Sequence, residues 1–177
     1  LKPELPNVLL ILDNSANWGE TDGKPDTAKF AIEKSALGSV VNGMSDQFNI
    51  GIMLYTQAKR AEAGYASTLG AYPIFGMRQS VESARDVLSS MIAGFDVSAD
   101  RGDASTVGLA MHEAWAYFKG TDARAGHTSK RRDYRGNPDN LAGTNLLNNA
   151  FSGAGVSTYT NFVIDPCQKN YIIYVSN

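Results

Sequence analysis

The sequence predicts an α/β fold in which a mostly parallel sheet carries helices on both of its faces. The run at residues 7–13 is apolar until it closes on an acid, which is typical of a strand buried on both faces. Helical and strand-like segments alternate along much of the remaining chain, as they do in proteins built from strand–helix–strand units. The 177 residues, of which 43% are hydrophobic, are enough to bury one core of this kind.

The expected strands are short runs separated by loops or helices. They cover residues 7–13, 48–56, 58–67 and 171–177. The third run is more polar and follows the second after a very short turn. We therefore expect it to be the antiparallel partner of the second strand at a sheet edge. The fourth run has the composition of a buried strand.

Three segments have the apolar spacing of helices, namely residues 25–42, 80–93 and 105–118. Pro25 suits the first turn of the first helix, and Gly43 marks its end. Residues 68–77 and 94–103 are expected to be loops, because Gly, Pro, Asp or aromatic residues dominate them. Residues 119–166 have almost no periodicity and are rich in Gly, Asn and Ser, so we expect a long polar insertion there.

Composition argues against several classes of protein. The net charge of −2 and the pI of about 5.7 provide no basic field for nucleic acid or an anionic membrane. The basic run at residues 130–132 is followed by Asp133 and Asp139, which interrupt the basic cluster around it. We therefore interpret this run as a solvated loop face. No apolar run approaches the roughly 20 residues of a membrane-spanning helix. The single cysteine, Cys167, excludes an internal disulfide, and burial, a free thiol and pairing with an outside partner all stay open.

The end of the first strand carries the strongest candidate site. In α/β sheets ligands bind beyond the carboxyl ends of the strands. Asp13, Ser15 and Asn17 place oxygen-bearing side chains at alternate positions there, and a tight loop can aim them at one point. Such a cluster suits a hard cation. The alternative is an Asx-type turn in which Asp13 or Ser15 caps nearby amides.

The run NVLLILDNSAN resembles the D-x-S-x-S loop of von Willebrand factor A domains, in which an Asp and two Ser contribute to a metal-ion-dependent adhesion site. The segment before the third helix resembles the family's second loop and puts Ser105 on its Thr. The final V-S-N puts Asn177 on the Asp of the third loop. The resemblance implies a site of Asp13, Ser15, Asn17, Ser105 and Asn177 for Mg²⁺ or Ca²⁺. Because Asn177 removes one of two carboxylates, we expect a degenerate site with weakened binding.

The whole chain resembles a more particular family. PNVLLILDNSAN, a helix ending in EAWAYF, a polar insertion and PCQKNYIIYVSN together resemble the N-terminal domain of PilY-type proteins of bacterial type IV pili. These are tip-associated adhesins and biogenesis factors. The resemblance implies a secreted protein of the periplasm or cell surface, located at the pilus tip, with a β-propeller further along the parent chain. Its partners would be proteins, either pilus components or a host or surface receptor.

The same resemblance bears on the length of the domain. The family sheet has six strands, typically in the order 3-2-1-4-5-6, and four are expected here. Residues 1–177 would then be a single partial domain, truncated after the fourth strand, and we predict that this strand is a sheet edge prone to pairing with another chain.

An enzyme is the alternative class. His112 falls within the third expected helix and is interpreted as a surface or half-buried side chain, whereas His127 falls in the insertion and is interpreted as solvated. No nucleophile elbow, phosphate-binding loop or zinc-binding helix motif occurs in the sequence. A hydrolase or transferase using Asp13 stays possible, but a phospho-aspartate enzyme usually has a second Asp where Ser15 stands. We therefore expect a binding module, and a purely structural module is a third possibility.

Overall fold

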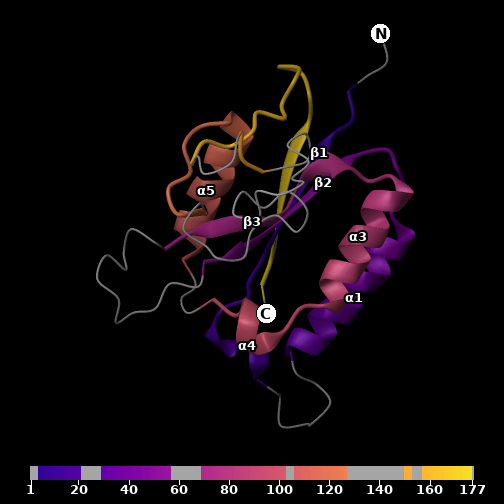
Figure 1. Cartoon of the computed structure of the whole chain (residues 1–177), viewed down its shortest axis with the longest axis vertical. Coiled ribbons are helices and arrows are strands. Elements are labelled where there is room, and N and C mark those ends of the chain that lie inside the picture. The colour runs from indigo at the N-terminus through magenta and orange to yellow at the C-terminus, as the bar shows by residue number, and fades with distance from the viewer. Residues whose placement is uncertain are drawn as a thin grey trace.

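A four-stranded mixed sheet forms the centre of the fold (Figure 1). The computed structural model describes residues 4–20, 29–56, 69–102, 106–126, 150–152 and 157–176. Its strands are β1 (Asn7–Leu12), β2 (Asn49–Tyr55), β3 (Ala71–Gln79) and β4 (Asn170–Val175). They lie in the order β3-β2-β1-β4, with β1 parallel to both of its neighbours and β3 antiparallel to β2. The predicted α/β class with a mostly parallel sheet is confirmed.

Helices cover both faces of the sheet (Figure 1). The longer ones are α1 (Lys29–Gly43), α3 (Glu82–Ala93) and α5 (Val107–Lys119). The predicted helices at 25–42, 80–93 and 105–118 are thus confirmed, although α3 and α5 begin after positions 80, 81 and 106, and positions 25–28 and 105 lie outside the described residues. Two short elements, η1 (Ala16–Gly19) and α4 (Val97–Asp100), are the other helices of the described residues. No helix in the described residues is both long and apolar enough to span a membrane.

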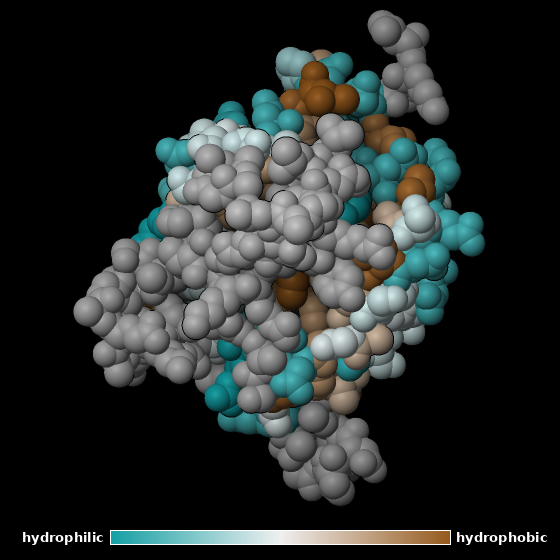
Figure 2. Space-filling model, in the orientation of Figure 1, coloured by the Kyte–Doolittle hydropathy of each residue, from teal (hydrophilic) through white to brown (hydrophobic). Residues whose placement is uncertain are grey.

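The sheet separates two hydrophobic clusters because successive strand residues point to opposite faces. Leu10 and Leu12 of β1 pack on the side of α1 and α3, whereas Leu9 and Ile11 pack on the side of α5. Each such side chain contributes roughly 1.5–3 kcal/mol through burial. The surface over α1 and α3 is mostly teal and white in Figure 2, with separate brown residues, as expected for helices that bury one side only.

Three asparagines fix the register of the parallel strands. Asn7, Asn49 and Asn170 open β1, β2 and β4 at the same level of the sheet. The Asn49 amide donates to Asn7 Oδ1 at 2.8 Å, and the Asn7 amide donates to Asn170 Oδ1 at 2.8 Å. A slip of one residue would break both bonds and reverse the faces of the strand, so this ladder also determines which side chains meet at the opposite ends.

The prediction for the antiparallel partner of β2 was wrong. That partner is β3, in the segment at 68–77 that was expected to be a loop, whereas the expected strand at 58–67 lies outside the described residues. Pro73 and Gly76 made the segment resemble a loop. Pro73 is tolerated because β3 is an edge strand, and the β2–β3 pairing is irregular between Ile50 and Met53.

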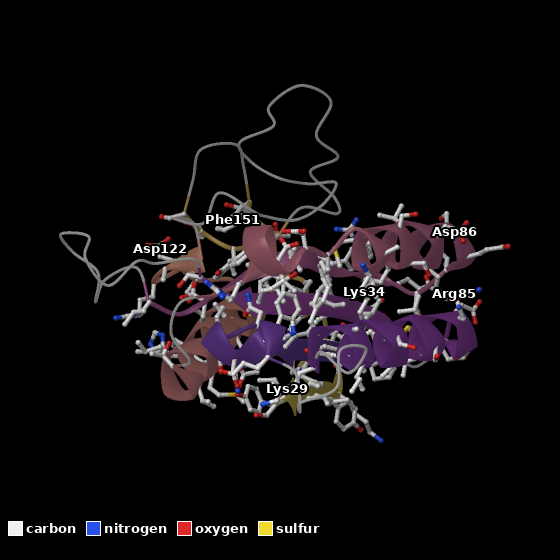
Figure 3. All side chains as sticks on the ribbon, turned by 90° about the horizontal axis from the view of Figure 1, so that it is seen from below. Lys29, Lys34, Arg85, Asp86, Asp122 and Phe151 are labelled. Atoms are coloured by element: carbon white, nitrogen blue, oxygen red, sulfur yellow. The ribbon has the colours of Figure 1, made fainter. Side chains whose placement is uncertain are left out.

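The predicted polar insertion at 119–166 contributes to the core over its described parts, contrary to expectation. Asp122 bridges to Thr158 and Phe151 bridges to Tyr159, which places these segments side by side, as the labelled Asp122 and Phe151 illustrate in Figure 3. Phe151 and Tyr159 are fully buried against the cluster on the α5 face. Their contribution was missed because isolated buried residues in irregular backbone produce no periodic pattern. The expected loop at 94–103 likewise contains α4.

Strand β4 lies at the edge of the described sheet, as predicted, but it is not buried. Tyr171 and Ile173 project to the α1 face and Ile172 to the α5 face, and all three are more than 40% exposed. No charged residue occurs within β4. Natural sheets usually protect an edge with charge, proline or a bulge.

The chain is therefore expected to self-associate through β4 as its concentration rises. Replacing Ile173, which is 48% exposed, with lysine should weaken association about tenfold by placing charge on the edge. Sedimentation equilibrium measures this change. Ile164→Lys is the matched control, because Ile164 is more exposed (71%) but lies outside the sheet. A monomer at all concentrations, or an equal effect of both variants, would contradict the prediction.

Candidate functional site

The carboxyl ends of three neighbouring parallel strands bring polar side chains together. Asp13 follows β1, Tyr55 closes β2, and Tyr174 and Ser176 lie at the end of β4. Because side chains alternate between faces, Asp13, Tyr55 and Tyr174 continue the side of the sheet that packs on α5. The parallel pairing of β2, β1 and β4 thus builds one cluster from β1 and β2 together with β4, which lies more than 100 residues further along the chain.

The Asp13 carboxylate is the centre of this cluster and is only 7% exposed. The Ser15 backbone N–H donates to its Oδ1 at 3.1 Å, which is the Asx-type turn that the sequence offered as the alternative to a cation site. On the other oxygen, the Tyr174 hydroxyl donates to Oδ2 at 2.8 Å and the Ser176 hydroxyl does so at 3.4 Å. The carboxylate therefore joins its own loop to the end of β4.

A second hydroxyl extends the cluster. The hydroxyl oxygens of Tyr55 and Tyr174 are 2.9 Å apart. Burial raises the pKa of Tyr55, and its bond to Tyr174 and the charge of Asp13 raise it further. Burial likewise raises the pKa of Tyr174. Both phenols consequently stay protonated and act as donors throughout the physiological pH range.

Asn14 holds the loop in place, although it was not among the predicted ligands. Its side chain is fully buried, accepts the Tyr55 N–H at 2.7 Å and donates to the carbonyl of Asp100. Its backbone carbonyl accepts the Gly102 N–H at 2.7 Å. Asn14 thereby connects the end of β1 to the end of β2 and to the segment around α4, and its role is structural.

Ser15 and Asn17 follow Asp13 in the same loop, and their side chains bond to each other. The Ser15 hydroxyl donates to Asn17 Oδ1 at 2.9 Å. Asn17 lies in η1, and the next residue, Trp18, packs its ring edge-on against Phe30 of α1 at 4.6 Å between centroids. The indole N–H of Trp18 donates to Glu33 Oε2 at 2.6 Å. The loop is thus anchored to the first helix by an aromatic contact and a hydrogen bond.

The remaining predicted ligands, Ser105 and Asn177, lie outside the described residues. Their described neighbours reach the cluster, since Gly102 bonds to Asn14 and Ser176 bonds to Asp13. Within the described part of the chain, no group of three or more His, Cys, Asp and Glu residues is placed to hold a metal ion. Any cation here would rely on Asp13 together with hydroxyl and amide oxygens.

The structure also bears on the other residues considered in the sequence. His112 is exposed on α5, with its ring 5.7 Å from that of Trp115, and His127 lies outside the described residues. Cys167 is exposed, so burial is excluded among the alternatives that the sequence left open. Its N–H donates to Asp165 Oδ1 in the turn before β4, where backbone geometry rather than apolar packing places the side chain outside.

Tyr55, Tyr174 and Ser176 were not among the residues predicted from the sequence. In the sequence alone, Tyr55 and Tyr174 cannot be distinguished from ordinary strand residues. The signal that could have found them is the asparagine at the start of each parallel strand, because aligning these asparagines places Tyr174 level with Ile11 and Val175 level with Leu12. The strand ends then fall beside Asp13.

Comparison with models of protein families finds no match, and no curated protein matches the chain either. The class of the protein therefore rests on its own geometry. It is an α/β domain with a mixed four-stranded sheet, helices on both faces and a carboxylate-centred polar cluster at the ends of its parallel strands.

Proposed function

We propose that this chain is a von Willebrand factor A-like adhesion and assembly module of a PilY-type protein at the tip of bacterial type IV pili. It binds a protein partner, either a pilus component or a surface receptor, through the strand-end face around Asp13, Ser15 and Asn17. The supporting observation is the position of Asp13 at the end of an interior strand, with polar groups from β2 and β4 converging on it. The parent protein continues into a β-propeller and is secreted.

A divalent cation fits the chemistry of this face. Asp13, Ser15 and Asn17 provide a carboxylate, a hydroxyl and an amide oxygen within five residues, and hard cations such as Mg²⁺ and Ca²⁺ prefer oxygen ligands. A single carboxylate gives weak affinity, because affinity in oxygen sites falls with ligand charge. When bound, the cation would supply an open coordination position for a carboxylate of the partner.

The alternative function, a hydrolase or transferase using Asp13, has weaker support. The Ser15 hydroxyl donates to the amide oxygen of Asn17, which is not a base that could activate it. Asp13 is buried and already accepts hydrogen bonds on both oxygens, whereas a nucleophilic carboxylate needs a lone pair directed at substrate. We therefore propose a module without catalytic activity.

The test is carried out in the bacterium that produces the parent protein, with pilus assembly and surface attachment measured separately. Asp13→Asn should impair at least one of the two, because an NH2 group then replaces one of the two acceptor oxygens of the cluster and the charge is removed. Asp86→Asn is the matched control, since Asp86 is exposed on α3, away from the strand ends (Figure 3).

Two outcomes would overturn the proposal. The first is normal assembly and normal attachment after deletion of the whole domain. The second is turnover of a generic phosphatase or esterase substrate by the purified chain that disappears in Asp13→Asn, which would establish the enzyme instead.

A further inference from the structure

The side chains at the end of β4 occupy the carboxylate oxygen that a cation would need. Asp13 Oδ1 is directed to the Ser15 N–H within the loop. Asp13 Oδ2 accepts from Tyr174 at 2.8 Å and from Ser176 at 3.4 Å. Both contacts place a hydroxyl proton against the carboxylate, where it partly neutralises the negative charge.

The direction of these bonds follows from counting protons. Tyr174 has one hydroxyl proton, and it donates that proton to Asp13. The 2.9 Å contact with Tyr55 must then be a donation from the Tyr55 hydroxyl to the Tyr174 oxygen. Donors polarise one another along such a chain, so Tyr55 strengthens the bond between Tyr174 and Asp13.

A divalent cation and this hydroxyl exclude each other at Oδ2. The proton that Tyr174 directs at the carboxylate carries partial positive charge and lies where a cation would approach. Binding therefore has to break a charge-assisted hydrogen bond inside a buried cluster before an ion–carboxylate contact forms.

We propose that Tyr174 competes with divalent cations for Asp13 and so keeps the strand-end site closed to them, an inference that rests on the proposed cation-assisted recognition. Tyr55 supports Tyr174 as a positioning residue. Weak affinity for divalent cations is already expected because the site lacks a second carboxylate. The Tyr174 hydroxyl is then a second cause, and it is specific to this chain. Removing the Tyr174 hydroxyl should strengthen cation binding, although it removes an oxygen from the site.

Calorimetric titration of the purified chain with MgCl₂ and with CaCl₂ tests this proposal. Tyr174→Phe should bind at least one cation about tenfold more tightly than the unaltered chain, which corresponds to the loss of one charge-assisted hydrogen bond. Tyr171→Phe is the matched control and should change nothing, because it is the same substitution on the opposite face of β4. Adding Asp13→Asn to Tyr174→Phe should abolish the gain.

Binding by Tyr174→Phe that is unchanged, weaker or absent would overturn the proposal, since the hydroxyl would then be a ligand or irrelevant. If circular dichroism shows that this variant does not fold, Tyr55→Phe takes its place. That variant keeps the bond to Asp13 but removes its support, so a gain of about threefold is expected, and no gain is a refutation.

The titration contains no partner, so its failure is distinct from failure of the proposed function. If Asp13→Asn loses attachment but Tyr174→Phe does not bind cations more tightly, the adhesion module is supported. Only the proposed competition between Tyr174 and the cation is then refuted. A gain in Tyr174→Phe together with normal assembly and attachment after deletion of the whole domain would support the competition and refute the adhesion module.

Discussion

Replacing Glu113 with alanine is expected to lower the free energy of unfolding by about 4 kcal/mol, the cost of breaking a buried charged network. Glu113 is 0% exposed in the middle of α5. Its Oε1 accepts the Arg124 and Gly126 N–H groups, each at 3.1 Å, and the Tyr159 hydroxyl at 2.6 Å. Its Oε2 accepts the Ala125 N–H at 2.9 Å.

The effect is large because one carboxylate satisfies four donors from two distant segments. Without it, three backbone N–H groups and a buried phenol would lose their acceptor. Gly126 also depends on this arrangement, since a Cβ there would collide with the Tyr159 hydroxyl. The segments after α5 are therefore expected to detach from the sheet in the variant, and not only to lose stability locally.

Urea denaturation of three variants measures the effect. Glu113→Gln keeps one acceptor oxygen and should cost about 2 kcal/mol, while the exposed Glu20→Ala should stay within about 0.5 kcal/mol of the unaltered chain. Tyr159→Phe removes a single donor and should cost about 1 kcal/mol. A loss below 1 kcal/mol in Glu113→Ala would show that water replaces the carboxylate and that the network is not structural.

Glu113 also illustrates which parts of the fold could be predicted from the sequence. Continuous apolar runs identified β1 and β2, and apolar residues at helical spacing identified the three longer helices. Glu113 lies on the buried face of α5 with Ala110, Ala114 and Tyr117. A charged residue on an apolar stripe is a sign of a buried partner, but its partners at 124–126 and 159 lie in irregular backbone that no periodic pattern describes.

The candidate site likewise has a part that local sequence spacing predicts and a part that depends on contacts between distant segments. Asp13, Ser15 and Asn17 are neighbours in the chain, so local spacing was sufficient to predict that they share one loop. Tyr55 and Tyr174 reach Asp13 only through the register of β2, β1 and β4, which depends on contacts between distant segments. β3 was missed for a different reason, because its edge position removes the usual penalty for Pro73.

Glu33→Gln is expected to raise the free energy of unfolding by about 1–2 kcal/mol at about pH 8 and to have little effect at about pH 5. Burial raises the pKa of Glu33 from 4.5 to about 7, and the nearby charge of Asp13 raises it while the hydrogen bond from Trp18 lowers it. Its Oε1 is buried and accepts no hydrogen bond from the described residues. The folded chain therefore favours the protonated acid.

The sign follows from the protons bound in each state. Between about pH 4.5 and pH 7 the folded chain holds the Glu33 proton more tightly than the unfolded chain does. Stability consequently falls as the pH rises through this window and levels off above it. Glutamine keeps an acceptor for the Trp18 indole but cannot ionise, so the variant loses this part of the pH dependence. The expected change in the free energy of unfolding is smaller than the full pKa shift would give, because Glu33 is only half-buried and solvent screens its charge.

The measurement uses Trp18 as its reporter. The chain has two tryptophans, so Trp115→Phe leaves Trp18, whose indole N–H donates to Glu33 at 2.6 Å, as the single indole. Its fluorescence should titrate with a midpoint near pH 7, and this transition should disappear when Glu33→Gln is added. Denaturation profiles of the two proteins should diverge over the same window, whereas the exposed Glu82→Gln leaves both readouts unchanged. A midpoint near the ordinary value of 4.5 would mean that water reaches Glu33, and the anchor between the Asp13 loop and α1 would then be open to solvent.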